Sequence, residues 1–152
     1  MPKKESYPLD RADRELLRLL HVNARATVKE LAQSVGLSAP STAERLRKLE
    51  DAGVLTGYRV EIDPMALGFS LSAVVRIRQR PGQMRQVEAL IREIPQFVEC
   101  VKVTGDDCFI ARLFLRDIDE LDPILERISE YGETNTAIVK STPLKLRLPP
   151  LG

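Results

Sequence analysis

The chain has 152 residues, 43% of them hydrophobic and 30% charged, which is typical of a globular protein with one large domain or two small ones. Its short apolar runs, such as Leu71–Val75, exclude a membrane-spanning helix, and its first residues lack the apolar stretch of a signal peptide. Two cysteines, Cys100 and Cys108, make a poor disulfide framework and favour a reducing cytoplasm. Residues 1–63 hold 11 Lys and Arg against 10 Asp and Glu, so DNA binding must be argued from local geometry.

Three helices are predicted between residues 10 and 53. Asp10 is a good N-cap for the first helix. The second begins at Thr27, which forms a capping-box pattern with Glu30, and it ends at Gly36. Ser38 caps the third helix, which ends near residue 53. The apolar residues of the third helix, which we expect to be buried, are Ala43, Leu46 and Leu49.

The short turn between the second and third helices predicts a helix-turn-helix motif whose third helix enters the major groove of double-stranded DNA. The short hydroxyl side chains of Ser41 and Thr42 allow the helix to approach the bases closely. Arg45 can reach a guanine edge, and Lys48 suits a phosphate. The alternative is that this stripe is only the solvated face of an amphipathic helix. The predicted DNA-binding residues are Arg25, Thr27, Ser38, Ser41, Thr42, Arg45, Arg47 and Lys48.

Residues 54–62 alternate as a strand does, and Asp63-Pro64 ends that pattern. The remaining patterns follow the order βαββαβ, the ferredoxin-like arrangement. A sheet covered by helices on one face leaves the other face exposed, and dimerisation would bury that exposed face. The predicted strands are 71–80, 98–104, 109–115 and 136–146, and the predicted helices lie at 84–94 and 118–131.

Few residues offer chemistry beyond binding. His21 is the only histidine, so a histidine-based metal cluster or a catalytic triad lacks partners. No metal site, catalytic residue or cofactor is therefore predicted. A small ferredoxin-like enzyme stays open as a minor alternative, for which only Asp106, Asp107 and Cys108 could act.

A dense set of residues carries a family resemblance: Leu9-Asp10, Asp13, Leu16-Leu17, Leu20, Asn23-Ala24-Arg25, Glu30-Leu31-Ala32, Val35-Gly36-Leu37-Ser38, residues 44–50, Gly53-Val54-Leu55 and Gly57-Tyr58. They closely resemble the Lrp/AsnC, or feast/famine, family of transcriptional regulators. The resemblance implies an α+β protein with a winged helix-turn-helix domain at residues 1–53 and a connector at 54–69 that contributes to subunit pairing. It also implies a ferredoxin-like domain at 70–148 that binds an effector and forms homodimers, which commonly assemble into tetramers or octamers.

In relatives, the effector is often an amino acid bound near the loop that joins the middle strands. The family pattern there has an aspartate before an aromatic residue, and this chain has Cys108 before Phe109. The alternative is that the loop is only a hairpin turn. The effector-binding residues that the resemblance implies are Gly105, Asp106, Asp107, Cys108, Thr134 and Thr136.

The sequence therefore predicts a cytoplasmic, nucleoid-associated regulator that binds specific DNA sites and is modulated by a small molecule such as an amino acid. No membrane partner is expected. The alternative of a different class is an architectural DNA-binding protein without any ligand.

Overall fold

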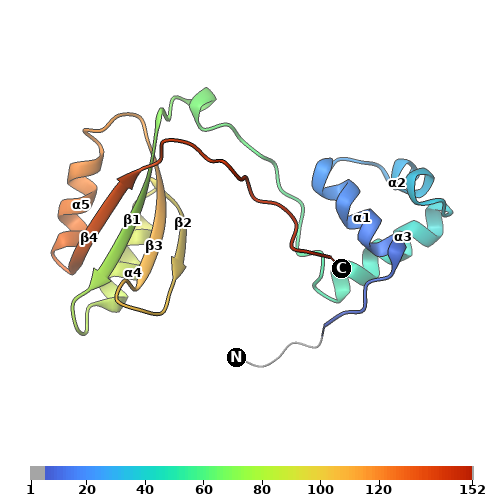
Figure 1. The fold of residues 1–152 in the computed structure, drawn as a ribbon, viewed down its shortest axis with the longest axis horizontal. Helices are drawn as coiled ribbons and strands as arrows, with labels where there is room; N and C mark the ends of the chain where they lie inside the picture. Colours follow the sequence, from blue (N-terminus) through green and yellow to red (C-terminus); the bar gives the residue numbers. More distant parts are fainter. Residues whose placement is uncertain (1–5, 152) are drawn as a thin grey trace. The chain divides into compact units, whose positions relative to one another are not determined.

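The computed structural model describes residues 6–151 and divides into two units (Figure 1). The helical unit contains the residues up to Glu61 together with those from Leu144 onward, and the sheet unit is Ile62–Pro143. The last residues of the predicted second domain, 70–148, are grouped in space with the helical unit from Leu144 onward. Residues 1–5 of the predicted first domain lie outside the described part.

The helical unit is built from α1 (Arg11–Val22), α2 (Val28–Val35) and α3 (Ala39–Asp51). Apolar side chains of all three helices meet in one small core. Among the described residues no strand precedes Leu71, so the expected wing is not formed as a hairpin within this chain. The buried members of this core are Leu16, Leu20, Leu31 and Leu46.

Side-chain caps explain where these helices begin. The Asp10 carboxylate accepts a hydrogen bond of 2.8 Å from the Asp13 N–H, and Asp13 caps Asp10 in return. Thr27 and Glu30 form the predicted capping box at the start of α2. Gly36 ends α2 with a φ of 70°, a left-handed conformation that glycine adopts without the steric cost of a Cβ atom.

The sheet unit has the predicted βαββαβ order, and its four antiparallel strands lie in the order β2-β3-β1-β4. A short 3₁₀ helix, Met65–Leu67, precedes it. None of the helices in residues 6–151 has the length and apolar character needed to cross a membrane. The elements are β1 (Leu71–Gln79), α4 (Met84–Glu93), β2 (Phe97–Lys102), β3 (Phe109–Leu115), α5 (Leu121–Ser129) and β4 (Gly132–Ile138).

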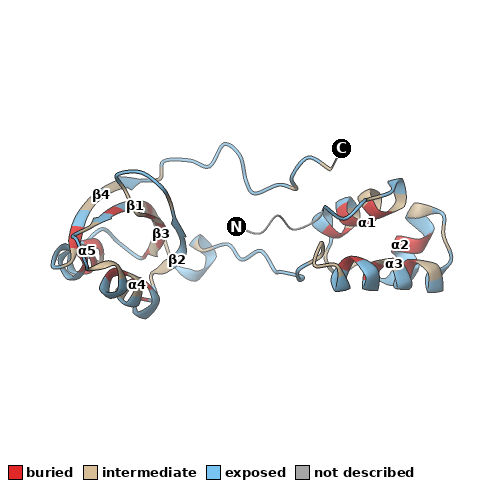
Figure 2. Ribbon diagram, turned by 90° about the horizontal axis from the view of Figure 1, so that it is seen from below, coloured by how far each residue is buried: buried red, intermediate tan, exposed pale blue. Residues whose placement is uncertain are grey.

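Helices α4 and α5 cover one face of the sheet, and the buried residues lie on that side (Figure 2). Val75 and Ile77 of β1 and Leu113 of β3 are fully buried there. Their strand neighbours, such as Arg76, point to the other side, because side chains alternate along a strand. We call this second side, which no helix covers, the open face.

Two predicted strands are wrong. The last one is Gly132–Ile138 rather than 136–146, because pairing with β1 ends where Ile138 meets Ala73. Residues 54–62 form no strand, because a strand needs a neighbour to bond its backbone groups and this segment has none in the described chain. Their alternating side chains, including Val60 and Ile62, are exposed.

Candidate nucleic-acid interface and ligand site

Residues 36–38 form the turn that joins α2 to α3. The Ser38 hydroxyl caps α3 by accepting a hydrogen bond from the Ser41 N–H at 3.3 Å. The buried side of α3 then packs on the rest of the helical unit through Thr42, Leu46 and Leu49. The opposite side of the helix is exposed to solvent in the described part of the chain. Its exposed residues over the first three turns are Ala39, Pro40, Ala43, Glu44, Arg47 and Lys48.

The prediction that Thr42 contacts DNA is wrong. Its side chain is 0% exposed, and its hydroxyl donates a hydrogen bond of 3.0 Å to the Ser38 carbonyl oxygen. That bond satisfies the hydroxyl inside the helix, so the threonine packs in the core as an apolar residue would. Its neighbour Ala43, predicted to be buried, is exposed instead. The exposed stripe of α3 is thus rotated by one residue from the predicted one.

Arg45 is held by two carboxylates of the first helix. Its Nη1 atom lies 2.6 Å from Asp10 Oδ2 and 2.9 Å from Asp13 Oδ1, and Asp13 is only 5% exposed. The Asp13 N–H and the Arg45 guanidinium lower the pKa of Asp10, and the two carboxylates raise the pKa of Arg45. We call these three residues the arginine clamp. It joins α3 to α1, so the Arg45 cation is already engaged within the protein.

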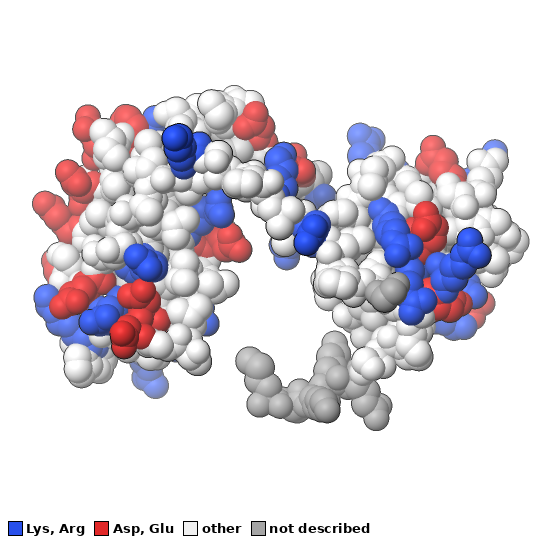
Figure 3. All heavy atoms as spheres, viewed as in Figure 1, with Lys and Arg blue, Asp and Glu red and all other residues white. Residues whose placement is uncertain are grey.

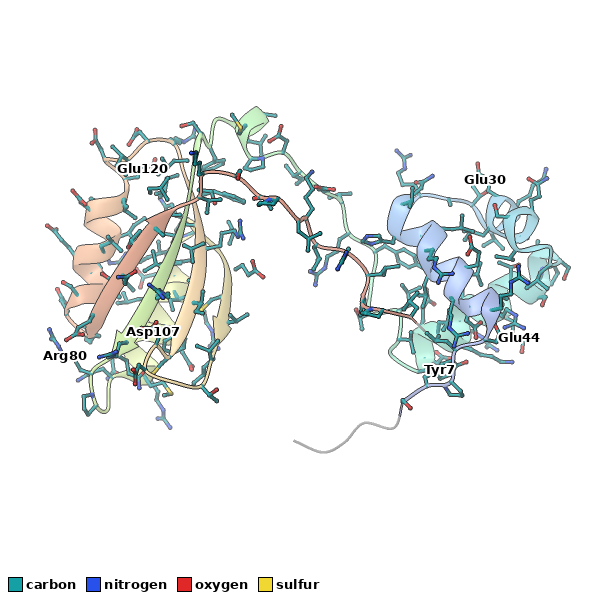
Figure 4. The ribbon with its side chains drawn as sticks, viewed as in Figure 1. Tyr7, Glu30, Glu44, Arg80, Asp107 and Glu120 are labelled. Atoms are coloured by element: carbon teal, nitrogen blue, oxygen red, sulfur yellow. The ribbon has the colours of Figure 1, made fainter. Side chains whose placement is uncertain are left out.

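The charged residues on the exposed side of α3 differ in their partners. Lys48 Nζ lies 2.9 Å from Glu44 Oε1, and this contact lowers the pKa of Glu44. Among the described residues Arg47 forms no ion pair, so its guanidinium remains available. Basic and acidic side chains are intermixed on the visible surface of the helical unit (Figure 3). Glu44 of α3 lies near Tyr7, which precedes α1 (Figure 4).

The turn before α2 carries two more residues predicted to contact DNA. Arg25 is exposed, and its backbone N–H donates to the Asn23 side chain at 3.0 Å. Thr27 is exposed too, but its hydroxyl donates to Glu30 Oε2 at 2.9 Å. Both residues lie on the surface of the helical unit, where a phosphate can reach them.

The predicted effector loop lies between β2 and β3 at the end of the sheet that also carries Arg80 (Figure 4). Asp106 is exposed and lies 3.7 Å from Arg78 Nη2, while Asp107 Oδ2 lies 3.8 Å from Arg76 Nε. Arg76 also donates a hydrogen bond of 2.9 Å to Asn135 across the open face. The two loop carboxylates therefore face arginines of β1, which the sequence analysis did not include.

The two threonines of the predicted effector set lie on the other side of the sheet. Thr134 pairs with Ile77 and Thr136 with Val75, and paired residues share a face. The Thr136 hydroxyl is buried and has no hydrogen-bond partner within the described chain. Cys108 is partly buried against the same core. Within one chain the structure does not gather the predicted effector residues into one site, because strand alternation separates them.

Several candidate functional residues were not predicted from the sequence. Arg76 and Asn135 could have been found by following the period of two along β1, since Val75 and Ile77 on either side of Arg76 are apolar. Pro40 and Ala43 gave no such signal, because small apolar residues in a helix are usually assigned to the core. No group of three or more His, Cys, Asp or Glu side chains comes together as a metal site in residues 6–151.

Comparison with known proteins decides the family. A sequence model described as the Lrp/AsnC ligand binding domain matches residues 72–149, and one described as a winged helix-turn-helix DNA-binding domain matches residues 9–56. The chain belongs to the Lrp/AsnC family. It is a DNA-binding transcriptional regulator with a helix-turn-helix domain and a ligand-binding domain, and the predicted fold class is confirmed.

Family members with this arrangement have been characterised and solved. A proline dehydrogenase transcriptional activator of Rhodobacter capsulatus is 37% identical over 125 residues, covering 80% of this chain and 81% of that protein. A feast or famine regulatory protein of Mycobacterium tuberculosis, solved with L-methionine, is 33% identical with a TM-score of 0.84, covering 93% and 99% of the two chains. A transcriptional regulator of Neisseria meningitidis, also solved with L-methionine, is 27% identical with a TM-score of 0.83, covering 95% and 97%.

Proposed function

We propose that this Lrp/AsnC regulator binds specific operators in double-stranded DNA as a homodimer, and that an amino acid bound to its sheet unit changes its affinity for DNA. The observation that carries the first part is the geometry of α3. A helix joined to α2 by a glycine-containing turn presents a side whose residues are exposed to solvent within the described part of the chain.

The DNA contacts divide into two kinds. We assign exposed or partly exposed residues around the turns and along one edge of α3 to phosphate contacts, which position the protein without reading sequence. We assign base contacts to the exposed side of α3 itself, where the Arg47 guanidinium forms no ion pair with another described residue. We no longer assign Arg45 to base reading, because its guanidinium is engaged in the arginine clamp. The proposed phosphate contacts are Arg25, Thr27, Ser38, Ser41 and Lys48.

The homodimer is proposed to form through the open face of the sheet. That face carries Val74, Ile110 and Phe114, all partly exposed in the single chain, and pairing would remove them from water. Assembly of dimers into tetramers or octamers is proposed on the family relationship. Sedimentation at micromolar concentration should show no stable species of 17.1 kDa, the mass of one chain. A single species of that mass would contradict the dimer.

An amino acid is the proposed effector because two similar structures were solved with L-methionine. In this chain Gly105, Asp106 and Asp107 of the loop are the proposed contacts on the open side of the sheet, with Cys108, Thr134 and Thr136 on the other. A second subunit is needed to bring the two groups together. Thermal unfolding in the presence of each of the twenty amino acids tests this, because a ligand of the native state raises the melting temperature. No shift with any of them would contradict an amino-acid effector.

Operator binding is tested by selecting duplexes from a randomised library with the full-length protein. We expect enrichment of one sequence that binds more than about 1000-fold tighter than its shuffled version at the same salt concentration. Equal binding of both duplexes would contradict a sequence-specific regulator and would support the architectural alternative. The same regulator would then act throughout the nucleoid rather than at operators.

A further inference from the structure

The exposed side of α3 begins with small apolar residues. Ala39 and Pro40 occupy its first turn, and Ala43 follows about one turn later, all three exposed to solvent. A DNA-facing surface usually carries long polar side chains, yet here none stands between the helix backbone and an approaching molecule at this end. Small side chains let the backbone come close to the base edges, and they leave an apolar surface there.

The next turn of the same side carries Glu44 and then Arg47. The other basic residues of α3 are engaged, since Arg45 belongs to the clamp and Lys48 is paired with Glu44. Arg47 follows Ala43 by four residues, so the two lie on one side of the helix about 6 Å apart along its axis. Base pairs are spaced about 3.4 Å apart, so this separation spans roughly two base pairs.

We propose that Ala43 and Pro40 contact the methyl group of a thymine in the major groove, and that Arg47 reads a guanine roughly two base pairs away. Thymine C5-methyl is the apolar group that the major groove offers, and alanine is suited to it. An arginine forms two hydrogen bonds with guanine O6 and N7. The proposal rests on the proposed function, because it requires α3 to enter the groove.

The experiment starts from the duplex that the wild-type protein selects from a randomised library. Each thymine is replaced in turn by deoxyuridine, which lacks only the methyl group, and each guanine by 7-deazaguanine, which lacks the N7 acceptor. Dissociation constants are measured for the wild type, Ala43→Ser and Arg47→Ala. The exposed Arg18→Ala on α1 serves as a control for loss of a positive charge. Circular dichroism confirms that every variant is folded.

For the wild type we expect one or two thymine positions and a guanine near them to be sensitive, with the guanine replacement weakening binding about fivefold or more. Ala43→Ser should distinguish the thymine duplex from the deoxyuridine duplex less than the wild type does, because a hydroxyl then faces the methyl group and only Pro40 remains as an apolar contact. Arg47→Ala should lose the sensitivity to 7-deazaguanine. Arg18→Ala should keep both sensitivities.

Two results would overturn the proposal while leaving the proposed function intact. One is a selected operator in which no thymine replacement weakens binding by the wild type. The other is an Arg47→Ala protein that remains as sensitive to 7-deazaguanine as the wild type. If the wild type selects no sequence at all, both the proposal and the sequence-specific function fail.

Discussion

The Asp13 carboxylate is buried in the small helical unit, and the guanidinium of Arg45 is its ionic partner there. A buried charge without a partner is costly, because it has lost its hydration and gains nothing in return. The sequence presented Arg45 as one more basic residue on α3. Only the packing of α1 against α3 shows that its guanidinium faces inward toward two carboxylates.

We therefore expect Arg45→Ala to destabilise the helical unit by about 2 kcal/mol, because it leaves the Asp13 carboxylate buried and unpaired. Urea unfolding followed by circular dichroism measures the loss. The double variant with Asp13→Asn should lose less than the sum of the two single variants, since the partners have been removed together. An Arg45→Ala protein with unchanged stability but a weakened operator affinity would return Arg45 to the base-reading set.

Thr42 and Ala43 show why the exposed side of α3 was misjudged by one position. Residue type alone places an alanine inside and a threonine outside. A helical threonine can satisfy its hydroxyl on the carbonyl four residues earlier, as Thr42 does with Ser38, and can then be buried. The predicted roles that depend on exposure therefore changed, although the helix itself was predicted correctly.

At the scale of elements, the helix ends that depend on nearby residues were predicted correctly, and the strands that depend on pairing with distant residues were not. The three N-terminal helices begin at caps that the sequence displays, because a cap joins residues only three apart. Strand β4 was placed too late, because the apolar residues after Ile138 continue the alternation although β1 no longer pairs with them. The prediction of a strand at residues 54–62 was wrong for the same reason. The faces of the sheet, which separate Asp107 from Thr136, follow only once the register is known.

The cap of α1 makes an acid-sensitive contribution to stability. The pKa of Asp10 is lowered in the folded chain, first by the Asp13 N–H and then by Arg45. A lowered pKa means that the charged form stabilises the fold, so this contribution is present above about pH 4 and is lost as the pH falls through the folded pKa.

We expect the melting temperature of the wild type to fall between about pH 5 and about pH 3, and to fall less steeply in Asp10→Asn. The matched control is Asp51→Asn, which removes the same charge from an exposed position at the end of α3. Equal slopes for the wild type and Asp10→Asn would show that the cap and the clamp do not carry the acid sensitivity.

At the scale of the whole molecule, the C-terminal residues belong to the helical unit. The Arg14 guanidinium donates a hydrogen bond of 2.6 Å to the Leu151 carbonyl oxygen, and Lys145 pairs with Glu61 at 3.0 Å. Leu148 and Leu151 are partly buried in a segment whose other residues are exposed. The chain thus enters the sheet unit at Ile62 and leaves it at Pro143, and its last described residues lie in the helical unit.

This arrangement predicts that the C-terminal segment stabilises the helical unit. Leu148→Ser should lower its stability by about 1 kcal/mol, since part of an apolar side chain is returned to water. Leu146→Ser is the matched control, because Leu146 is 93% exposed. Urea unfolding distinguishes the two variants. An equal effect of both substitutions would mean that the segment does not pack on the helices.

The most direct test of the proposed regulator is the affinity of the full-length protein for its selected operator, measured with and without saturating amino acids, beginning with L-methionine. Binding at two sites is reciprocal, so an effector must change operator affinity by the factor by which the operator changes effector affinity. We expect at least one amino acid to shift the dissociation constant by about fivefold or more, with the same factor in the reverse titration. An operator affinity that no amino acid changes would contradict the account of a DNA-binding regulator controlled by an amino acid.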